Sequence, residues 1–200
     1  VEPEYQKKMN KRIQSRLRSA HLRGCPQELT NCVDSAEREY LPRGITETLS
    51  TLDFIDSGLN VCILGPSDSG KSYLAKAIGI VACNNYKVEY HHCETLLETL
   101  VALKAQDYSK YQKRLKKICG AALLILDDFL LHTITDEREV KVLFEILEKR
   151  CEINLSTIIC SQREPASWSS MILNDEVSAN AILKRATKHY TVVIKPNITD

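Results

Sequence analysis

The chain alternates between short apolar runs and longer stretches in which apolar residues recur every three or four positions. Short apolar runs are typical of buried strands, and the longer spacing is typical of helices with one buried face. The predicted strands cover residues 61–64, 87–93, 121–128, 156–162 and 190–195, and the predicted helices cover 46–55, 73–81, 94–105, 135–150, 165–172 and 176–186. Because strands and helices alternate, the pattern predicts an α/β fold, a parallel sheet with helices on both faces.

A different pattern marks the N-terminal part of the chain. Residues 4–23 place Tyr5, Met9, Ile13 and Leu17 four positions apart, which predicts a helix with a narrow apolar stripe. Proline and glycine then interrupt the sequence up to residue 44, which predicts a connector with one short helix. We therefore divide the chain into a helical N-terminal segment with its connector, residues 1–44, and an α/β domain, residues 45–200. We expect the N-terminal segment to be truncated.

Composition and charge are those of an ordinary globular protein, with 44% hydrophobic residues, 26% charged residues and a net charge of +1. The eight cysteines show no C-x-x-C pair, so we expect reduced thiols. His91, His92 and Cys93 are neighbours in a predicted strand and point to alternate faces, so we expect no shared metal ion. The sequence shows neither a signal peptide nor an apolar run of the roughly 20 residues that a membrane helix needs. These features predict a soluble, cytoplasmic protein with no membrane partner.

Positive charge is concentrated in two segments, so any contact with nucleic acid has to be local. The first segment holds Lys7, Lys8, Lys11, Arg12, Arg16, Arg18 and Arg23, and the second holds Lys104, Lys110, Lys113, Arg114, Lys116 and Lys117. Such a cluster either follows a phosphate backbone or is the solvated face of a helix. The sequence leaves both interpretations open.

Residues 65–72 have the spacing G-x-x-x-x-G-K-[ST] of the Walker A phosphate-binding loop, between a predicted strand and a predicted helix. In such a loop, backbone N–H groups surround phosphate oxygens at a helix N-terminus. We expect Lys71 to contact the β- and γ-phosphates of ATP and the Ser72 hydroxyl to bind Mg²⁺. The expected nucleotide-contacting residues are Gly65, Pro66, Ser67, Asp68, Ser69, Gly70, Lys71, Ser72 and Tyr73.

Two polar pairs at the ends of later strands supply the acidic and γ-phosphate-sensing groups that the Walker A loop lacks. Asp127 and Asp128 end an apolar strand in the Walker B pattern, so that Asp127 would hold Mg²⁺ and Asp128 would polarise the attacking water. Ser161 and Gln162 end the next strand, where a polar side chain would lie between the two motifs and sense the γ-phosphate. The expected catalytic set within one chain is therefore Lys71, Asp128 and Gln162.

In this order the motifs resemble the IstB family of transposition helper ATPases, which belong to the AAA+ class, and more distantly the DnaC helicase loader. The likeness spans residues 13–194, and its narrower markers are residues 159–162, Trp168 and residues 181–185. It implies a P-loop AAA+ core, ATP and Mg²⁺ as cofactors, a homo-oligomer on duplex DNA, and a transposase or, alternatively, a replicative helicase as partner.

The resemblance also implies that Arg185 is an arginine finger that acts on the γ-phosphate of a neighbouring subunit. The sequence suggests one other cation for that role, Arg150, which ends a predicted helix. Two departures from the family pattern are Asp68 in the phosphate loop and Lys184 in place of the usual aspartate before the arginine. Two rival functions are a small-molecule kinase, for which we find no arginine-rich lid, and a static ATP-binding module, which would not need Asp128.

Overall fold

The computed structural model describes residues 2–172 and 176–197. Its six strands are β1 (Arg38–Leu41), β2 (Val61–Leu64), β3 (Val88–His92), β4 (Leu123–Asp127), β5 (Ser156–Ser161) and β6 (Tyr190–Pro196). They form one sheet in the order β1-β6-β2-β5-β4-β3. Strands β2 to β6 are parallel, whereas β1 pairs antiparallel with β6 at the edge. The carboxyl ends of five strands therefore meet at one edge of the sheet, where α/β proteins bind ligands.

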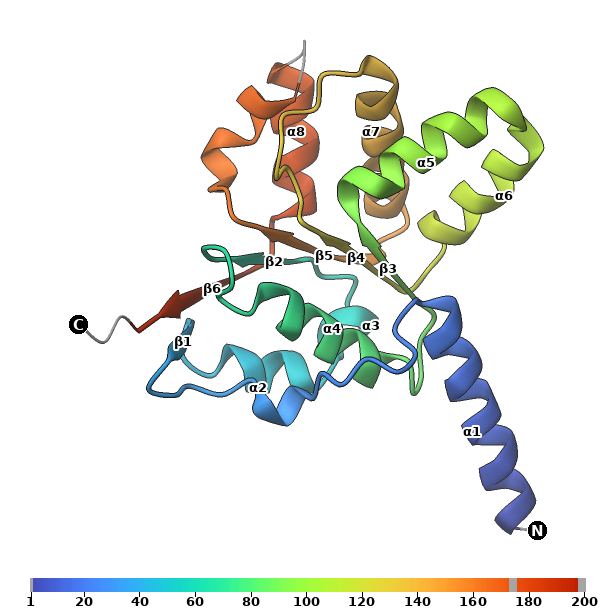
Figure 1. Ribbon diagram of the computed structural model, residues 1–200, viewed down its shortest axis with the longest axis vertical. Coiled ribbons are helices and arrows are strands. Elements are labelled where there is room, and N and C mark those ends of the chain that lie inside the picture. The colour runs from blue at the N-terminus through green and yellow to red at the C-terminus, as the bar shows by residue number, and fades with distance from the viewer. Residues whose placement is uncertain (1, 173–175, 198–200) are drawn as a thin grey trace.

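Helices cover both faces of this sheet. They are α1 (Glu2–Ser19), α2 (Ile45–Ser50), α3 (Asp53–Asp56), α4 (Lys71–Ala82), α5 (Cys93–Gln106), α6 (Tyr108–Cys119), α7 (Glu137–Glu152) and α8 (Glu176–Ala186), with 3₁₀ turns at Leu29–Asn31, Pro165–Ser167 and Ser169–Met171. Helices α5 to α8 lie on one face and α2 to α4 on the other, while α1 projects from the body (Figure 1). The expected α/β fold with helices on both faces is confirmed.

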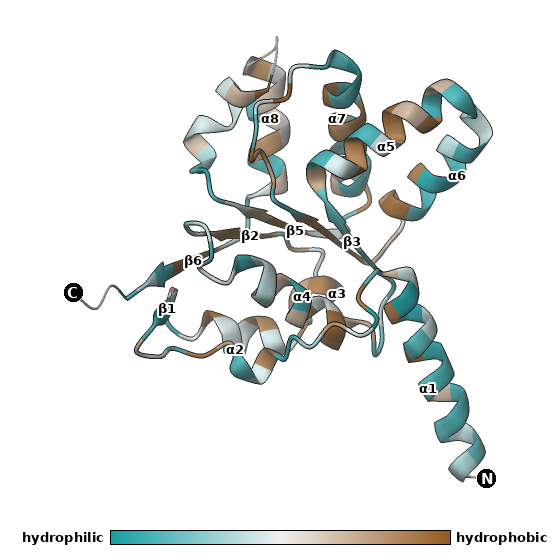
Figure 2. Cartoon of the chain, in the orientation of Figure 1, coloured by the Kyte–Doolittle hydropathy of each residue, from teal (hydrophilic) through white to brown (hydrophobic). Residues whose placement is uncertain are grey.

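The strands fill two separate cores because their side chains alternate between the faces. Cys62 and Leu64 of β2 pack in the cluster formed with α5 to α8, whereas Val61 and Ile63 pack in the cluster formed with α4. The apolar residues are accordingly concentrated in the central strands and on the inner faces of the helices (Figure 2). A sheet buried on both faces explains why its strands read as continuous apolar runs.

Three segments differ from their predictions. The connector contains the strand β1, which we did not predict, so the sheet is not entirely parallel. The helix predicted over 46–55 is divided into α2 and α3, because Leu52 between them has a left-handed backbone with φ 62°. The helix predicted over 165–172 is a pair of 3₁₀ turns around Trp168, whose indole nitrogen donates to the Arg163 carbonyl at 2.9 Å.

Helix α1 is present as predicted, but most of it lies in solvent. Tyr5 and Met9, half of its apolar stripe, are 64% and 42% exposed. Only its C-terminal end is fixed, since Arg16 donates to the Cys83 carbonyl at 3.3 Å and the following residue, Ala20, accepts from the Tyr90 backbone N–H at 3.2 Å. Neither α1 nor any other helix among residues 2–172 and 176–197 is long and apolar enough to cross a membrane.

Candidate nucleotide-binding site

The phosphate loop connects the carboxyl end of β2 to the N-terminus of α4. Gly70 precedes the helix with φ 100°, a conformation that favours glycine, and no side chain caps the helix. The N–H groups of its first turn are therefore not occupied by a capping side chain and can bind an anion. At Gly65 an added Cβ would come within 2.6 Å of the Ser69 hydroxyl and 2.8 Å of the Ile194 carbonyl, so that only glycine fits there.

A cavity of about 370 Å³ opens above this loop and brings the predicted motifs together. Its lining residues are Arg38, Ser67, Asp68, Gly70, Lys71, Ser72, Tyr73, Asp128 and Gln162. The first motif, the second carboxylate of the acidic pair and the glutamine after β5 thus share one space. Gly65, Pro66 and Ser69 belong to the loop but do not line the cavity, and Asp127 is fully buried next to Asp128. Arg38, which comes from the connector, was missed by the sequence analysis.

Lys71 is buried and folded back onto its own loop. Its ammonium nitrogen donates to the Pro66 carbonyl oxygen at 2.6 Å. Burial lowers the pKa of Lys71, and the nearby charges of Asp127 and Asp128 oppose that shift. The lysine therefore lies within electrostatic reach of both carboxylates, held by a neutral carbonyl that a phosphate oxygen can replace as the stronger acceptor.

The two acidic residues are held differently. Asp127 is fully buried and accepts hydrogen bonds from the Tyr90 hydroxyl and, at 2.9 Å, from the Asp128 backbone N–H. Asp128 has a left-handed backbone with φ 51°, and its carboxylate lies 3.2 Å from the Nδ1 atom of His92. Burial and the contact with Asp127 raise the pKa of Tyr90, so that it remains a neutral donor. One carboxylate is thus rigid and enclosed, and the other faces the cavity.

Tyr90 and His92 were not among the predicted site residues. They point to the same side of β3 because they are two positions apart, and β3 pairs with β4 so that His92 lies opposite Asp127. The alternation of the predicted strand would have placed the two side chains on one face. The pairing of that face with the acidic strand depends on the register, which the sequence does not reveal.

Ser161 and Gln162, at the end of β5, have different roles. The Ser161 hydroxyl is buried, donates to the Phe129 carbonyl at 2.8 Å and accepts from the Arg163 N–H at 3.0 Å. Ser161 therefore fastens the loop after β4 to the end of β5. Gln162 is exposed and lines the cavity together with Lys71 and Asp128. Of the pair, Gln162 is the side chain placed to meet a ligand.

The two candidate arginine fingers lie far from this cavity in the same chain. Arg185 is exposed in the last turn of α8, and its backbone carbonyl accepts from the side chain of Asn60, the residue before β2, at 3.2 Å. That position is at the amino ends of the strands, the edge opposite the cavity. Arg150 is buried, and its guanidinium donates to four backbone carbonyls and the Thr157 hydroxyl. Arg150 is therefore a structural residue that cannot reach a phosphate.

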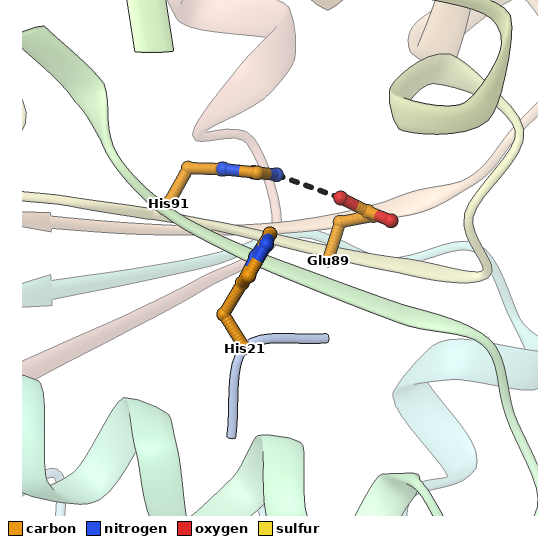
Figure 3. Close-up of side chains that lie close together, drawn as sticks. All are labelled: His21, Glu89 and His91. Carbon is orange, nitrogen blue, oxygen red and sulfur yellow. Dashed lines mark hydrogen bonds and ion pairs between the residues drawn. The ribbon is translucent and has the colours of Figure 1, made fainter. Parts of the chain in front are cut away.

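A second group of ionisable side chains lies beside the site on β3. His21, Glu89 and His91 have potential ligand atoms within 4.8 Å of one another, and Figure 3 shows the His91 imidazole directed toward the carboxylate with the His21 ring beside it. Glu89 is buried, yet His91 lies 2.7 Å from it, Lys117 lies 2.9 Å from it, and Arg114 lies 3.8 Å from it. Two cations already balance its charge, so the arrangement is that of an ion-pair network connecting β3 and α6 rather than of a metal site.

All eight cysteines are free, as expected, and six of them are buried. Cys93, next to the histidine pair, has its pKa raised to about 12 by burial, so its thiol stays protonated at neutral pH. His91 contacts Glu89 whereas His92 contacts Asp128, so the two adjacent histidines act in different environments.

Comparison with known proteins agrees with this geometry. The family model described as IstB-like ATP binding protein matches residues 1–197. The chain belongs to the IstB-like ATP-binding family. An insertion-sequence ATP-binding protein of Sinorhizobium fredii, y4uH, is 39% identical over 177 residues, which cover 88% of this chain and 68% of that protein. The IS21 ATP-binding protein of Pseudomonas aeruginosa is 29% identical over 195 residues, which cover 96% of this chain and 71% of that protein.

Solved structures share the fold at lower identity. The DnaC helicase loader superposes with a TM-score of 0.64 at 20% identity and covers 86% of this chain and 98% of its own. The replication initiator DnaA bound to AMPPCP and single-stranded DNA superposes with a TM-score of 0.68 at 19% identity and covers 86% of this chain and 50% of its own. The IstB-like chain is thus an ATPase with the AAA+ fold, as the sequence analysis predicted.

Proposed function

We propose that this IstB-like domain is the ATP-dependent, DNA-binding helper of a transposition system. It assembles on duplex DNA with ATP bound, and hydrolysis regulates how a target site is presented to a transposase. The family match and the insertion-sequence relatives support the ATPase part of this proposal. The observation that supports the DNA part is a basic groove on the side of the molecule away from the nucleotide.

The cavity residues divide the hydrolytic chemistry among them. Lys71 compensates the negative charge on the β- and γ-phosphates, and Gln162 contacts the γ-phosphate beside it. The Ser72 hydroxyl and the Asp127 carboxylate are oxygen donors of the kind that Mg²⁺ prefers, and the bound ion would neutralise charge on the phosphates. Asp128, which faces the cavity, orients the attacking water. His92 supports Asp128 from β3.

Arg185 completes the site from a neighbouring subunit. In its own chain it lies at the amino ends of the strands, whereas the cavity lies at their carboxyl ends, so it is exposed where a second copy can bind. A guanidinium supplied in this way stabilises the charge of the transition state and makes hydrolysis depend on assembly. This arrangement supports the proposed homo-oligomer.

The basic groove is a cavity of about 510 Å³ between α1, β3 and α6. It joins the two positive clusters of residues 7–23 and 104–117, which are far apart in the sequence, because Arg16 lines one wall and Lys113 and Lys116 line the other. Lys87 and Lys117 lie between them, and the one carboxylate among the lining residues, Glu89, is neutralised by its own ion pairs. Cations on both walls match the phosphates of a nucleic-acid backbone.

The nearest alternative is a helicase loader with a replicative helicase as its partner. It rests on the fold shared with DnaC, and it uses the same nucleotide site and the same assembly. The partner separates the two functions: a pull-down with purified transposase and purified helicase of the host, each with ATP, identifies which one binds.

The test of the DNA-dependent function is the ATPase rate with and without duplex DNA, together with DNA affinity as a function of salt. Stimulation by DNA is the expected result, because neither a kinase nor a static ATP-binding module requires it. Charge reversal at Lys113 and Lys116 should lower the salt slope by about one to two, uniformly across DNA sequences. These lysines are chosen because Arg114 and Lys117 also hold Glu89.

A matched control reverses the same amount of charge outside the groove, at the exposed Arg43 and Lys141, and should leave the slope unchanged. An unstimulated ATPase with a flat salt response would contradict the DNA-binding function. It would leave both clusters as solvated helix faces.

A further inference from the structure

The connector places one cation against the phosphate loop, at a position that the motifs do not explain. Arg38 is the first residue of β1 and pairs with Pro196 at the end of β6. The turn that precedes it is firmly held: the Ser35 hydroxyl accepts from the backbone N–H groups of Glu37 and Arg38 at 3.1 and 3.3 Å, and Asn197 donates to the Glu37 carbonyl at 2.8 Å. The strand therefore fixes the point from which the arginine side chain extends.

That side chain lies directly over Gly70. A Cβ added to Gly70 would be 2.4 Å from the Nη1 atom of Arg38 and 3.5 Å from its Cζ atom, so the guanidinium contacts the bare backbone of the loop. Gly70 also opens the first turn of α4, whose N–H groups are not capped by a side chain. A planar cation thus borders the place where backbone donors converge on an anion.

The charges that line the cavity also indicate that Arg38 helps to bind an anion. Asp68 and Asp128 contribute two negative charges to its wall, whereas Lys71 contributes one positive charge. Without Arg38 the lining would be net negative, which opposes the binding of a polyphosphate. With Arg38 the wall is neutral, and two cations lie on opposite parts of one loop.

The known contacts of Arg38 within the protein leave its charge available. Its ion pair with Glu37 is 3.9 Å long, and the Glu37 side chain is 84% exposed, so the pair is weak and screened by solvent. The Arg38 side chain itself is 31% exposed, on the side of the cavity. It also lies near the hydroxyl of Tyr40, whose pKa is raised by burial, so Tyr40 is a neutral neighbour rather than a counter-ion.

We infer that Arg38 is a nucleotide-contacting residue of this ATPase, which binds the polyphosphate of ATP from the connector and in the same chain as Lys71. Its guanidinium donates to phosphate oxygens on the Gly70 side of the loop and offsets the charge that Asp68 adds there. A nucleotide contact thereby extends to β1, a strand outside the two sequence motifs.

The experiment measures ATP and ADP affinity by calorimetry for Arg38→Ala, Arg38→Lys and the wild-type chain, with Lys71→Ala as the reference for a lost phosphate contact. Loss of a hydrogen bond between charged groups corresponds to roughly a 10- to 100-fold weaker affinity, which is the expected result for Arg38→Ala. Arg38→Lys should recover part of that loss, because it restores the charge but not the planar fork. Arg43→Ala, an exposed arginine near the same strand, should bind like the wild type.

Two further measurements separate a phosphate contact from a structural role. The thermal unfolding of Arg38→Ala without nucleotide should match that of the wild type, while the stabilisation produced by added ATP should be smaller. Glu37→Gln, which removes the ion pair alone, should leave ATP affinity unchanged. Wild-type affinity in Arg38→Ala would overturn the inference. So would a loss in Glu37→Gln equal to that in Arg38→Ala, since Arg38 would then act through its pair with Glu37.

Discussion

Asp128 occupies a backbone conformation that few side chains adopt, and this makes a clean substitution possible. Aspartate and asparagine both tolerate the left-handed region, so Asp128→Asn keeps the turn at φ 51° as well as the side-chain size. The variant should bind ATP and lose turnover by about 100-fold or more, because it removes the group that orients the water. Calorimetry and phosphate release measure the two properties. Asp136→Asn, at the partly exposed N-cap of α7, is the control and should retain turnover. Wild-type turnover in Asp128→Asn would make Asp128 a structural turn residue.

Arg150 illustrates a charge whose function is purely structural. It is buried, its guanidinium donates to backbone carbonyls and a hydroxyl rather than to a carboxylate, and burial lowers its pKa to about 10. Arg150→Ala would leave the carbonyls of Ile118, Cys119, Ala121 and Ser156 without this donor. We expect the free energy of unfolding to fall by about 3 kcal/mol or more, measured by urea denaturation. Lys149→Ala, one residue earlier and half exposed, removes a helix-surface pair and should lower it by only about 0.5 kcal/mol. Equal losses in the two variants would contradict this assignment.

Among single residues, the sequence predicted best those site residues that belong to a motif of fixed spacing. The loop from Gly65 to Ser72 directly follows an apolar strand, and the acidic pair and Gln162 each end one. In a parallel α/β sheet these strand ends lie at one edge, so the fold class predicted that the three would meet there. Arg38, Tyr90 and His92 reach the site only through the pairing of β1 with β6 and of β3 with β4. Register is a property of the assembled sheet, and no local pattern encodes it.

The junction of β3 and α6 depends on one buried carboxylate, and this gives the protein a testable response to acid. Burial alone would raise the pKa of Glu89, but hydrogen bonds from His91 and Lys117 hold it below its ordinary value, with His21 and Arg114 also nearby. The fold thus favours the ionised form. The resulting stability is present above the ordinary carboxyl pKa of about 4.3 and is lost as the pH falls through the lowered value in the folded protein.

Glu89→Gln should therefore be less stable than the wild type at pH 7, and the difference should shrink when the pH is lowered below about 4. Urea denaturation at a series of pH values measures both quantities. Glu37→Gln, an exposed carboxylate, is the control and should show little difference at any pH. A difference between wild type and Glu89→Gln that stays constant down to pH 3 would mean that the ion pairs of Glu89 do not stabilise the junction.

Among the elements, the long periodic helices and the apolar strands were predictable, and the short or polar ones were not. Strand β1 consists of Arg-Glu-Tyr-Leu and is recognisable only by its pairing with β6. The break between α2 and α3 rests on the backbone of Leu52, a residue type that gives no sign of a turn. The two basic clusters were visible in the sequence, but the groove between them exists only because α1 and α6 meet at β3.

For the whole molecule, the decisive feature is that Arg185 and the nucleotide cavity lie at opposite edges of one sheet. A single chain therefore cannot bring this arginine to its own ATP without unfolding α8 from the sheet. Two copies in an assembly can do so if the Arg185 edge of one meets the cavity of the next. Since such an interface joins different surfaces of the two copies, it repeats and forms a ring or a filament.

This geometry predicts complementation between two inactive proteins. Arg185→Ala and Asp128→Asn should each lose most turnover, since an arginine finger contributes roughly 10³- to 10⁵-fold in other P-loop enzymes. In a mixed assembly on DNA, some interfaces pair the intact Arg185 of one copy with the intact Asp128 of its neighbour, and phosphate release should partly return. Mixing Arg185→Ala with Arg185→Ala/Asp128→Asn is the control, because no interface in that mixture holds an intact arginine. If the first mixture stays inactive while labelled subunits demonstrably co-assemble, Arg185 does not act across the interface, and the shared site is wrong.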